Sequence, residues 1–466
     1  MRTKKNKPKP ILEQEYCKGC GRCVIACPKD ALHISSEINP VSGIFPAEID
    51  YDICNGCGLC VAACPEPYGL RAGHLEGEFQ LEDPEKLFGE KRTTAPRPVN
   101  IPSELLNMPD AEPFVIKGTY AAAIGALLGG CRHFFGYPIT PSTEGTELMA
   151  KVLPRLGGVF VQAVSEVATV NMMYGCGGAG LPCMTFTSSP GFSLMLEGIS
   201  YMISAQVPGV FINIMRGGPG LGNIGPEQAD LKLVCRGLGH GNTHAIALTP
   251  STPQEMLDLT MLAFELTFKY RNPVIVMGDG YLGQMTGPVK LPKKMSKPGL
   301  PDWAVYGDES HRKNLIASIK LSEPDLEQHN IMLNKKYEKI KASEQRAACF
   351  KCEDAEVLIV SCNIPAQMAK GAVQALRSRG IKAGLFRPIT VWPFPIDALK
   401  PLVRKAKKIV VVEASNGQLE DEMRLALSNS GIYKLPQIKS IRHFGGVLPQ
   451  MNEIIEKISA SEEVLS

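Results

Sequence analysis

The sequence predicts an α/β protein with two parallel-sheet domains and a small cysteine-rich module near its N-terminus. Eight of its 15 cysteines lie between Cys17 and Cys64. From Phe114 onward, apolar strand-like runs alternate with helical patterns, which indicates a parallel sheet covered by helices on both faces. A second series of such runs begins near residue 355, after a polar, lysine-rich stretch.

The composition narrows the class of protein. A chain of 466 residues has room for about three domains, and 44% hydrophobic with 21% charged residues is ordinary for a globular protein. A net charge of +3 and 6% aromatic residues give no support to nucleic-acid binding. No run of about 18 apolar residues is present, so we expect no membrane-spanning helix, and no apolar signal segment follows the basic N-terminus. The uneven cysteines argue against a disulfide scaffold, so we expect a cytoplasmic protein.

The cysteine-rich module contains the same motif twice. It reads C-K-G-C-G-R-C-V-I-A-C-P from Cys17 and C-N-G-C-G-L-C-V-A-A-C-P from Cys54. This spacing resembles that of bacterial two-cluster ferredoxins, in which three thiolates bind one [4Fe-4S] cluster and the fourth reaches the other. A structural zinc site would need four ligands in two pairs, which the triple spacing does not suit. The resemblance assigns one cluster to Cys17, Cys20, Cys23 and Cys64, and the other to Cys54, Cys57, Cys60 and Cys27.

The remaining elements follow in order. Residues 1–75 form the predicted ferredoxin-like module, and the Pro-, Glu- and Lys-rich residues 76–113 are predicted to be a linker. The first α/β domain is predicted over 114–283, a surface connector with one helical stretch over 284–354, and a second α/β domain over 355–466, whose last strand and helix pattern ends near Gly445. Five strands are predicted at V-F-V-Q-A, C-M-T-F-T, G-V-F-I-N-I, A-I-A-L and P-V-I-V-M.

One helix of the first α/β domain can be placed closely. Thr252 and Glu255 form a T-x-x-E capping box with Pro253 in the first turn. An apolar stripe at helical spacing follows and should be buried. The stripe consists of Met256, Leu259, Ala263 and Leu266.

Several long motifs in a fixed order indicate a family. The run F-G-Y-P-I-T-P-S-T-E from Phe135, M-R-G-G-P-G-L-G-N from Met215 and L-F-R-P-I-T-V-W-P-F-P from Leu385 resemble the α subunits of 2-oxoacid:ferredoxin oxidoreductases. The branch that acts on 3-methyl-2-oxobutanoate (2-ketoisovalerate) is the most similar. The resemblance implies a thiamine diphosphate-binding, pyrimidine-type domain over 114–283 and a transketolase C-terminal-like domain over 355–466, with a fused ferredoxin-like domain.

The resemblance also implies site residues. Glu166 would hydrogen-bond the aminopyrimidine ring of thiamine diphosphate and share a proton with it; an ordinary helix-start glutamate is the alternative. Thr140 would offer its hydroxyl to the 2-oxoacid. Arg216 would grip the substrate carboxylate with two hydrogen bonds, unless it is a plain surface arginine. The expected cofactor-contacting residues are Glu166, Tyr137, Pro138, Ile139, Thr140, Ser188 and Ser189.

The expected partners follow from an incomplete motif. Thiamine enzymes hold Mg²⁺ and the diphosphate with G-D-G and an asparagine about 25–30 residues later; Gly278-Asp279-Gly280 has no such asparagine and is interpreted as a strand-end turn. We therefore expect a β subunit that supplies the Mg²⁺-diphosphate site and a further iron–sulfur cluster, together with a γ subunit. A ferredoxin or another acceptor would take the electrons, and coenzyme A the acyl group.

The predicted reaction is CoA-dependent oxidative decarboxylation of a 2-oxoacid to acyl-CoA and CO2. The alternatives are a 2-oxoglutarate enzyme of the same family and a non-catalytic electron-transfer or docking protein that uses only its ferredoxin module. The sequence does not decide the 2-oxoacid, the direction, the stoichiometry or a role for Cys349 and Cys352. The other cysteines lie in apolar runs and are expected to be inert core thiols. They are Cys131, Cys176, Cys183, Cys235 and Cys362.

Overall fold

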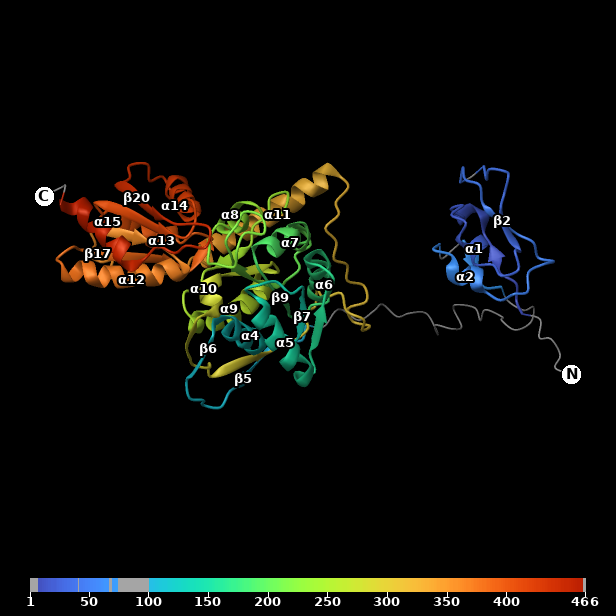
Figure 1. Cartoon of the computed structure of the whole chain (residues 1–466), viewed down its shortest axis with the longest axis horizontal. Coiled ribbons are helices and arrows are strands. Elements are labelled where there is room, and N and C mark those ends of the chain that lie inside the picture. Colours follow the sequence, from blue (N-terminus) through green and yellow to red (C-terminus); the bar gives the residue numbers. More distant parts are fainter. Residues whose placement is uncertain (1–6, 41, 67–68, 74–99, 464–466) are drawn as a thin grey trace. The chain divides into compact units, whose positions relative to one another are not determined.

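The structure, a computed structural model, describes residues 7–40, 42–66, 69–73 and 100–463 (Figure 1). The chain divides into two units, Met1–Thr94 and Ala95–Ser466. Most of the predicted linker, up to residue 99, lies outside the described residues.

The N-terminal unit repeats one small motif. Strand β1 pairs antiparallel with β4, and β2 pairs antiparallel with β3. Each of the two short helices follows a glycine in the left-handed conformation, Gly21 at φ 71° and Gly58 at φ 77°. A side chain would be strained at both positions, so these glycines let the chain turn directly from the cysteine loop into the helix. The elements are β1 (Ile11–Leu12), a 3-10 turn (Gln14–Tyr16), α1 (Arg22–Ile25), β2 (Leu32–Ile34), β3 (Ala47–Ile49), α2 (Leu59–Ala63) and β4 (Leu70–Arg71).

The second unit is built on a seven-stranded sheet. Its order is β18-β11-β12-β10-β9-β7-β8, and all neighbours are parallel except β11 and β18. Each of the five predicted apolar runs overlaps one of these strands. The strands are β7 (His133–Gly136), β8 (Val159–Gln162), β9 (Cys183–Thr187), β10 (Val210–Met215), β11 (Ile246–Leu248), β12 (Val274–Asp279) and β18 (Thr390–Trp392).

Helices cover this sheet and complete its core. Helix α4 packs against α5 and α9, and α6 packs against α7. The predicted capping box is confirmed, because the Thr252 side chain accepts a hydrogen bond from the Glu255 backbone N–H at 3.1 Å, and the predicted stripe is buried. The helices are α4 (Gly118–Leu128), α5 (Thr143–Val152), α6 (Glu166–Gly178), α7 (Ser189–Ser204), α8 (Leu231–Arg236), α9 (Pro253–Tyr270) and α10 (Gly280–Gln284), with a 3-10 turn at Leu153–Leu156.

The C-terminal domain has a five-stranded sheet of order β15-β17-β16-β19-β20, in which β15 is antiparallel and the other strands are parallel. Helix α11 (Glu323–Ser343) precedes it in the predicted connector. The strands are β15 (Ala347–Phe350), β16 (Val357–Val360), β17 (Ala383–Pro388), β19 (Lys408–Glu413) and β20 (Gln437–Arg442). The helices are α12 (Asn363–Ser378), α13 (Ile396–Val403), α14 (Gln418–Asn429) and α15 (Met451–Glu463).

Three features differ from the expected organisation. Strand β5 (Glu104–Asn107) arises in the predicted linker and pairs with β14 (Lys294–Lys297), while β6 (Phe114–Lys117) pairs with β13 (Thr286–Val289). Strand β18 leaves the C-terminal domain and joins the first sheet beside β11. Helix α15 extends the second domain beyond Gly445. Each element depends on a neighbour far away in the sequence, which local patterns do not reveal.

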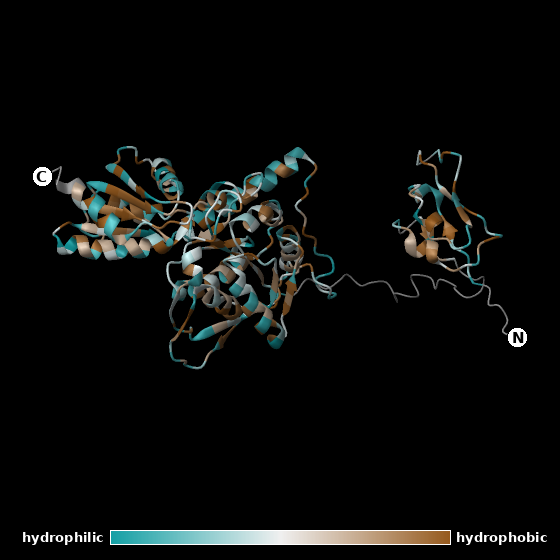
Figure 2. Ribbon diagram, viewed as in Figure 1, coloured by the Kyte–Doolittle hydropathy of each residue, from teal (hydrophilic) through white to brown (hydrophobic). Residues whose placement is uncertain are grey.

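Hydrophobic residues concentrate in the strands of both sheets, and hydrophilic residues mark the outer helix faces (Figure 2). Phe134 is fully buried, stacks on Phe160 at 5.1 Å between ring centroids and lies 6.2 Å from Phe186. In the part of the chain that the structure describes, no helix has the length and apolar character needed to cross a membrane.

Candidate functional site

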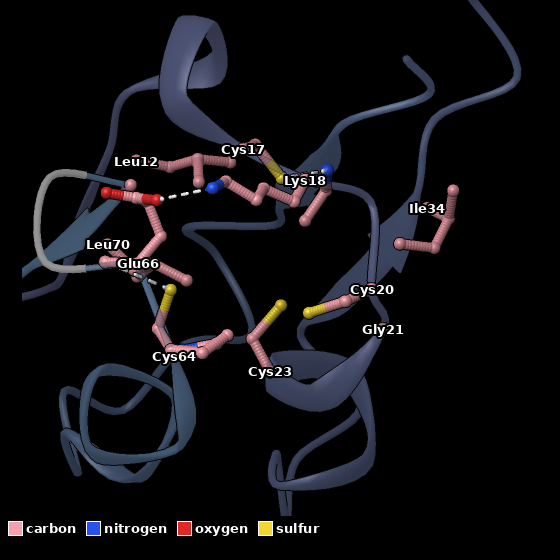
Figure 3. Close-up of a pocket in the computed structure, with 13 residues that line it drawn as sticks. Leu12, Cys17, Lys18, Cys20, Gly21, Cys23, Ile34, Cys64, Glu66 and Leu70 are labelled. Carbon is pink, nitrogen blue, oxygen red and sulfur yellow. Dashed lines mark hydrogen bonds and ion pairs between the residues drawn. The ribbon is translucent and has the colours of Figure 1, made fainter. Parts of the chain in front are cut away.

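Four of the predicted cluster cysteines line one small cavity in the N-terminal unit. Cys17, Cys20, Cys23 and Cys64 surround it, and Figure 3 shows their sulfur atoms turned toward a common space. These are the four residues that the motif spacing assigns to one cluster. At the edge of the cavity Lys18 forms an ion pair with Glu66 at 3.1 Å.

The donor set suits an iron–sulfur cluster. Backbone N–H groups of Ala47 and Ala31 donate to the sulfur atoms of Cys17 and Cys27 at 3.2 and 3.3 Å, a type of contact that stabilises thiolate ligands. Burial, followed by the charge of Cys17, raises the pKa of Cys23. A buried thiol with a raised pKa stays protonated unless a metal replaces the proton, and the iron of a cluster would supply that replacement here.

The second set of cysteines follows the same plan. Burial raises the pKa of Cys60, and the charges of Cys54 and Cys57 act in the same direction, so these three thiols lie near one another. The 37-residue repeat between Cys17 and Cys54 places Cys27 in the position that corresponds to Cys64.

The other predicted site residues gather at one edge of the large sheet. Strands β7, β8 and β9 follow one another in the chain, but in the sheet β8 lies on one side of β7 and β9 lies on the other. The direction in which the chain winds through the sheet therefore reverses at β7. Ligands of open α/β sheets bind outside the carboxyl ends of the strands at such a point. Thr140 follows β7, Glu166 follows β8, Ser188 and Ser189 follow β9, and Arg216 follows β10.

Glu166 occupies the first turn of α6. The Ser165 side chain caps this helix by accepting from the Ala168 N–H at 3.2 Å. Glu166 is only 6% exposed, and a side chain at Gly191 would collide with its carboxylate and with Thr187. Among the described residues its carboxylate takes part in no hydrogen bond, so it is available to hydrogen-bond a ligand. A buried, unshared carboxyl at this edge fits the group that binds an aminopyrimidine ring.

Arg216 connects the loops after three strands. Its guanidinium donates to the Thr140 carbonyl at 2.7 Å and to the Leu221 carbonyl at 3.1 Å, and its Nε is buried without a partner. Its backbone N–H donates to the Ser189 hydroxyl at 3.0 Å, while Ser188 donates to the Ile214 carbonyl at 2.7 Å. The two serines therefore hold the end of β9 against β10. Tyr137, Pro138 and Thr140 are exposed, and Ile139 is half-buried.

Two carboxyl groups beside Arg216 were not predicted. A cavity of about 300 Å³ is lined by Ser189, Arg216, Glu227 and Asp230, together with the glycine-rich turn after β10. Burial raises the pKa of both Glu227 and Asp230. Glu227 accepts from the Gly218 N–H at 2.9 Å. The E-Q-A-D run that follows the predicted glycine-rich motif was the available signal.

The loop after β10, which carries Glu227 and Asp230, is hydrogen-bonded to the C-terminal domain. The Gln228 amide group donates to the Cys362 carbonyl and to the Asn363 side chain, both at 3.1 Å, and accepts from the Ala414 N–H at 2.7 Å. Asn363 in turn donates to the Met277 carbonyl at 2.7 Å. All the hydrogen-bonding atoms of the Gln228 side chain are used across this domain boundary, so the boundary fixes the loop that carries Arg216.

The carboxylate of Asp279, in the incomplete G-D-G motif, accepts hydrogen bonds from backbone groups of this same chain. One carboxylate oxygen accepts from the N–H groups of Tyr281 and Leu282 at 3.0 and 2.9 Å, and the other accepts from the Ile364 N–H at 3.1 Å. Burial raises its pKa to about 6. These contacts make Asp279 the cap of α10 and fit the interpretation as a strand-end turn.

Comparisons with known proteins identify the family. Residues 124–348 match the family described as "Pyruvate flavodoxin/ferredoxin oxidoreductase, thiamine diP-bdg" and 355–454 match "Pyruvate:ferredoxin oxidoreductase core domain II". Residues 16–67 match "4Fe-4S dicluster domain". Ketoisovalerate oxidoreductase subunit VorB of Methanothermobacter thermautotrophicus is 43% identical over 346 residues, which cover 74% of this chain and 96% of the relative. The chain belongs to the 2-oxoacid:ferredoxin oxidoreductase family.

Other members of the family share the same core. The 2-oxoglutarate synthase subunit KorA of Methanocaldococcus jannaschii is 36% identical over 363 residues, 73% of this chain and 97% of the relative. A solved 2-oxoglutarate:ferredoxin oxidoreductase from Magnetococcus marinus, with 2-oxoglutarate, coenzyme A and succinyl-CoA bound, has a TM-score of 0.67 and 25% identity. The match covers 75% of this chain and 65% of that one. This family member therefore carries a thiamine diphosphate-binding domain and a 4Fe-4S dicluster domain in one polypeptide.

Proposed function

We propose that this chain is the α-type subunit of an enzyme that converts a branched-chain 2-oxoacid, with coenzyme A, to acyl-CoA and CO2. The electrons pass through two [4Fe-4S] clusters held by the eight motif cysteines to ferredoxin or another acceptor. The observation that carries the proposal is the buried, unshared Glu166 carboxylate at the sheet's switch point. Its presence in the same polypeptide as a thiol-lined dicluster unit supports coupling of decarboxylation to electron transfer.

Each site residue has a defined task. Thiamine diphosphate, when bound, supplies the nucleophile and the electron sink for decarboxylation. Glu166 shares a proton with the pyrimidine ring. Arg216 exchanges its contact with the Thr140 carbonyl for the substrate carboxylate, and Thr140 offers its hydroxyl to the same substrate. Tyr137 to Ile139 and the serines after β9 shape the surface under the cofactor.

The charges around the cavity favour a monocarboxylate. Among the described residues that line it, Arg216 is the one cation, against the carboxyl groups of Glu227 and Asp230. A second carboxylate, as in 2-oxoglutarate, would need a further cation that these residues do not provide. The higher identity to a ketoisovalerate oxidoreductase subunit than to a 2-oxoglutarate synthase subunit points in the same direction.

The remaining half of the cofactor site is proposed to come from partner chains. The three backbone contacts of Asp279 leave its carboxylate engaged within this chain. A β subunit would then hold Mg²⁺ and the diphosphate and carry a further cluster, with a γ subunit completing the assembly. The relatives' names as subunits support a hetero-oligomer.

The test uses the purified assembly with coenzyme A, a viologen dye and a panel of 2-oxoacids. Glu166→Gln keeps the side-chain volume and replaces the carboxyl group with an amide that cannot act as an acid or base, and we expect about 10²-fold or greater loss of acyl-CoA formation. Glu147→Gln on the exposed side of α5 is the matched control and should keep full activity. Full activity of Glu166→Gln would refute the catalytic assignment. Faster turnover of 2-oxoglutarate than of 3-methyl-2-oxobutanoate would refute the substrate assignment alone.

A further inference from the structure

Outside the proposed active site, the amino ends of β7 and β9 bring together three thiols and an imidazole. His133 and Cys183 are direct register partners on these neighbouring parallel strands. Cys131 lies just before β7, and its thiol donates to the His133 carbonyl at 3.4 Å. Cys176 lies in the last turn of α6, where its carbonyl accepts from the Leu181 N–H at 3.2 Å in the turn that leads into β9.

The Cys183 thiol and the His133 imidazole both interact with the Cys176 thiol. The Cys176 thiol also donates to the Leu181 carbonyl at 3.9 Å, and the Cys183 thiol to the Met173 carbonyl at 3.6 Å. Cys176 is half-buried, whereas Cys183 is only 1% exposed. His133 Nδ1 lies 3.3 Å from the Pro182 carbonyl, which leaves the other ring nitrogen for Cys176. One accessible sulfur therefore has an imidazole and a second, protected sulfur beside it.

We propose that Cys176 and Cys183 form a redox-active dithiol that peroxides oxidise to a disulfide. This arrangement separates the two roles such a pair needs. Cys176 is the accessible attacking sulfur, and Cys183 is the resolving sulfur behind it. The site lies at the strand ends opposite those that carry Glu166 and Arg216, so it is distinct from the proposed catalytic edge.

The electrostatics agree with the division of roles. The hydrogen bond from Cys183 first, and that from His133 next, lower the pKa of Cys176 to about 6 against the effect of burial. The pKa of Cys183 is raised well above its usual range by the contact with Cys176 and by burial. The remaining titratable neighbours are Cys131, whose pKa burial raises to about 12, and Arg132, whose guanidinium donates to the Leu127 and Cys131 carbonyls. These directions favour the thiolate at Cys176 over Cys183.

The reaction balances with hydrogen peroxide as the oxidant. The Cys176 thiolate attacks one peroxide oxygen, the O–O bond breaks, and the leaving hydroxide takes the proton from the His133 imidazolium to form water. The Cys183 thiol then attacks the Cys176 sulfenic sulfur, the S–O bond breaks, and the second hydroxide leaves as water with the Cys183 proton. Two thiols lose two electrons, and one peroxide becomes two waters.

A second thiol pair in the same chain provides the matched control. Cys349 is exposed, its neighbour Cys352 is buried, and burial raises the pKa of both, to about 12 for Cys352. Cys349 is thus the more accessible sulfur, but no imidazole activates it among the described residues. Accessibility alone predicts that Cys349 reacts first, whereas the proposal predicts Cys176.

The experiment treats the full-length, cluster-loaded protein anaerobically with iodoacetamide at pH 7 and maps the modified peptides. We expect Cys176 to react about tenfold faster than Cys349, and His133→Gln to slow Cys176 selectively. One equivalent of hydrogen peroxide should yield a Cys176–Cys183 disulfide, and Cys183→Ser should stop at a dimedone-reactive Cys176. Fully buried Cys235 is the internal marker of folding and must stay unlabelled in every variant.

Two results would overturn the proposal. Faster alkylation of Cys349 than of Cys176 in the wild-type protein would show that exposure decides reactivity. Peroxide treatment that leaves Cys176 reduced, or joins it to a cysteine other than Cys183, would remove the dithiol. Both readouts come from the wild-type protein, so they stand even if a variant fails to fold, and neither depends on 2-oxoacid turnover.

Discussion

The two units of this chain differ in what holds them together. The buried core of the N-terminal unit consists of Cys23, Leu32, Ala47, Cys60 and Leu70. Two of these five residues are proposed iron ligands. The large unit instead buries fully enclosed aromatic side chains such as Phe134, Phe186 and Phe211 around a seven-stranded sheet. In the small unit the site and the core share residues, whereas in the large unit the site lies at the edge of a core that exists without it.

The largest effect should follow removal of one cluster ligand. In Cys23→Ser the N-terminal unit loses a cluster and, with it, much of a core too small to persist alone, so we expect that unit to unfold completely. Residues 100–463 should keep their structure. Limited proteolysis under anaerobic conditions, with fragments identified by mass, measures both. Cys349→Ser is the control, and a proteolysis-resistant N-terminal unit in iron-free Cys23→Ser would break the comparison.

A substitution that creates a cavity in the large unit should lower its stability without unfolding it completely. Phe134→Ala removes a fully buried ring that stacks on Phe160, and we expect a loss of about 3–5 kcal/mol in the free energy of unfolding of the large unit. Denaturant titration followed by near-UV circular dichroism measures the loss. The iron content should stay at the wild-type value, and loss of both clusters in this variant would mean that the two units are not independent.

A half-buried histidine should make the large unit sensitive to acid. His244 stacks on Trp392 at 4.6 Å, and burial, followed by the charges of Lys341 and Arg236, lowers its pKa to about 4. Between pH 6.5 and 4 the unfolded chain binds a proton that the folded chain does not, so stability falls as the pH drops through this window. We expect a loss of about 1–3 kcal/mol, discounted for partial solvent contact.

The matched variant for this effect is His244→Phe, which keeps an aromatic ring and cannot titrate. The pH dependence of its melting temperature should be flatter than that of the wild type between pH 6.5 and 4. Parallel curves for the two proteins would show that His244 does not contribute to acid sensitivity.

The smallest effect concerns a single helix cap. Thr252→Ala removes the acceptor for the Glu255 N–H at the start of α9, and we expect a loss of about 1 kcal/mol. Thr252→Ser keeps the hydroxyl and should retain nearly all of the stability. A loss equal to that of Phe134→Ala would mean that α9, rather than the sheet, limits the stability of the large unit.

The parts of this structure that were predictable are governed by local chemistry. Each buried parallel strand is a short apolar run, and the α9 cap is a four-residue signal, so both can be recognised within one window of sequence. The four cysteines around the cavity of Figure 3 were predictable because the spacing of their motif matches known ferredoxins. Glu166 and Arg216 lie just after β8 and β10, because the family motifs that contain them mark strand ends.

The parts that were missed depend on contacts between distant segments. Strand β5 has four exposed residues and no apolar pattern, and it exists because β14 pairs with it. Cys176 was expected to lie in the core, and it is only half-buried, which the apolar run around it does not reveal. Glu227 and Asp230 gain their raised pKa values from burial under the glycine-rich turn, which only the fold defines.

The pairing of β18 with β11 has a consequence for synthesis of this protein on the ribosome. About 140 residues separate Leu248 from its partner Thr390. At about 5–20 residues per second, the edge of β11 emerges roughly 7–30 s before the strand that covers it. During that interval the nascent chain presents an open hydrogen-bonding edge, and a chaperone that shields it would raise the yield of native protein.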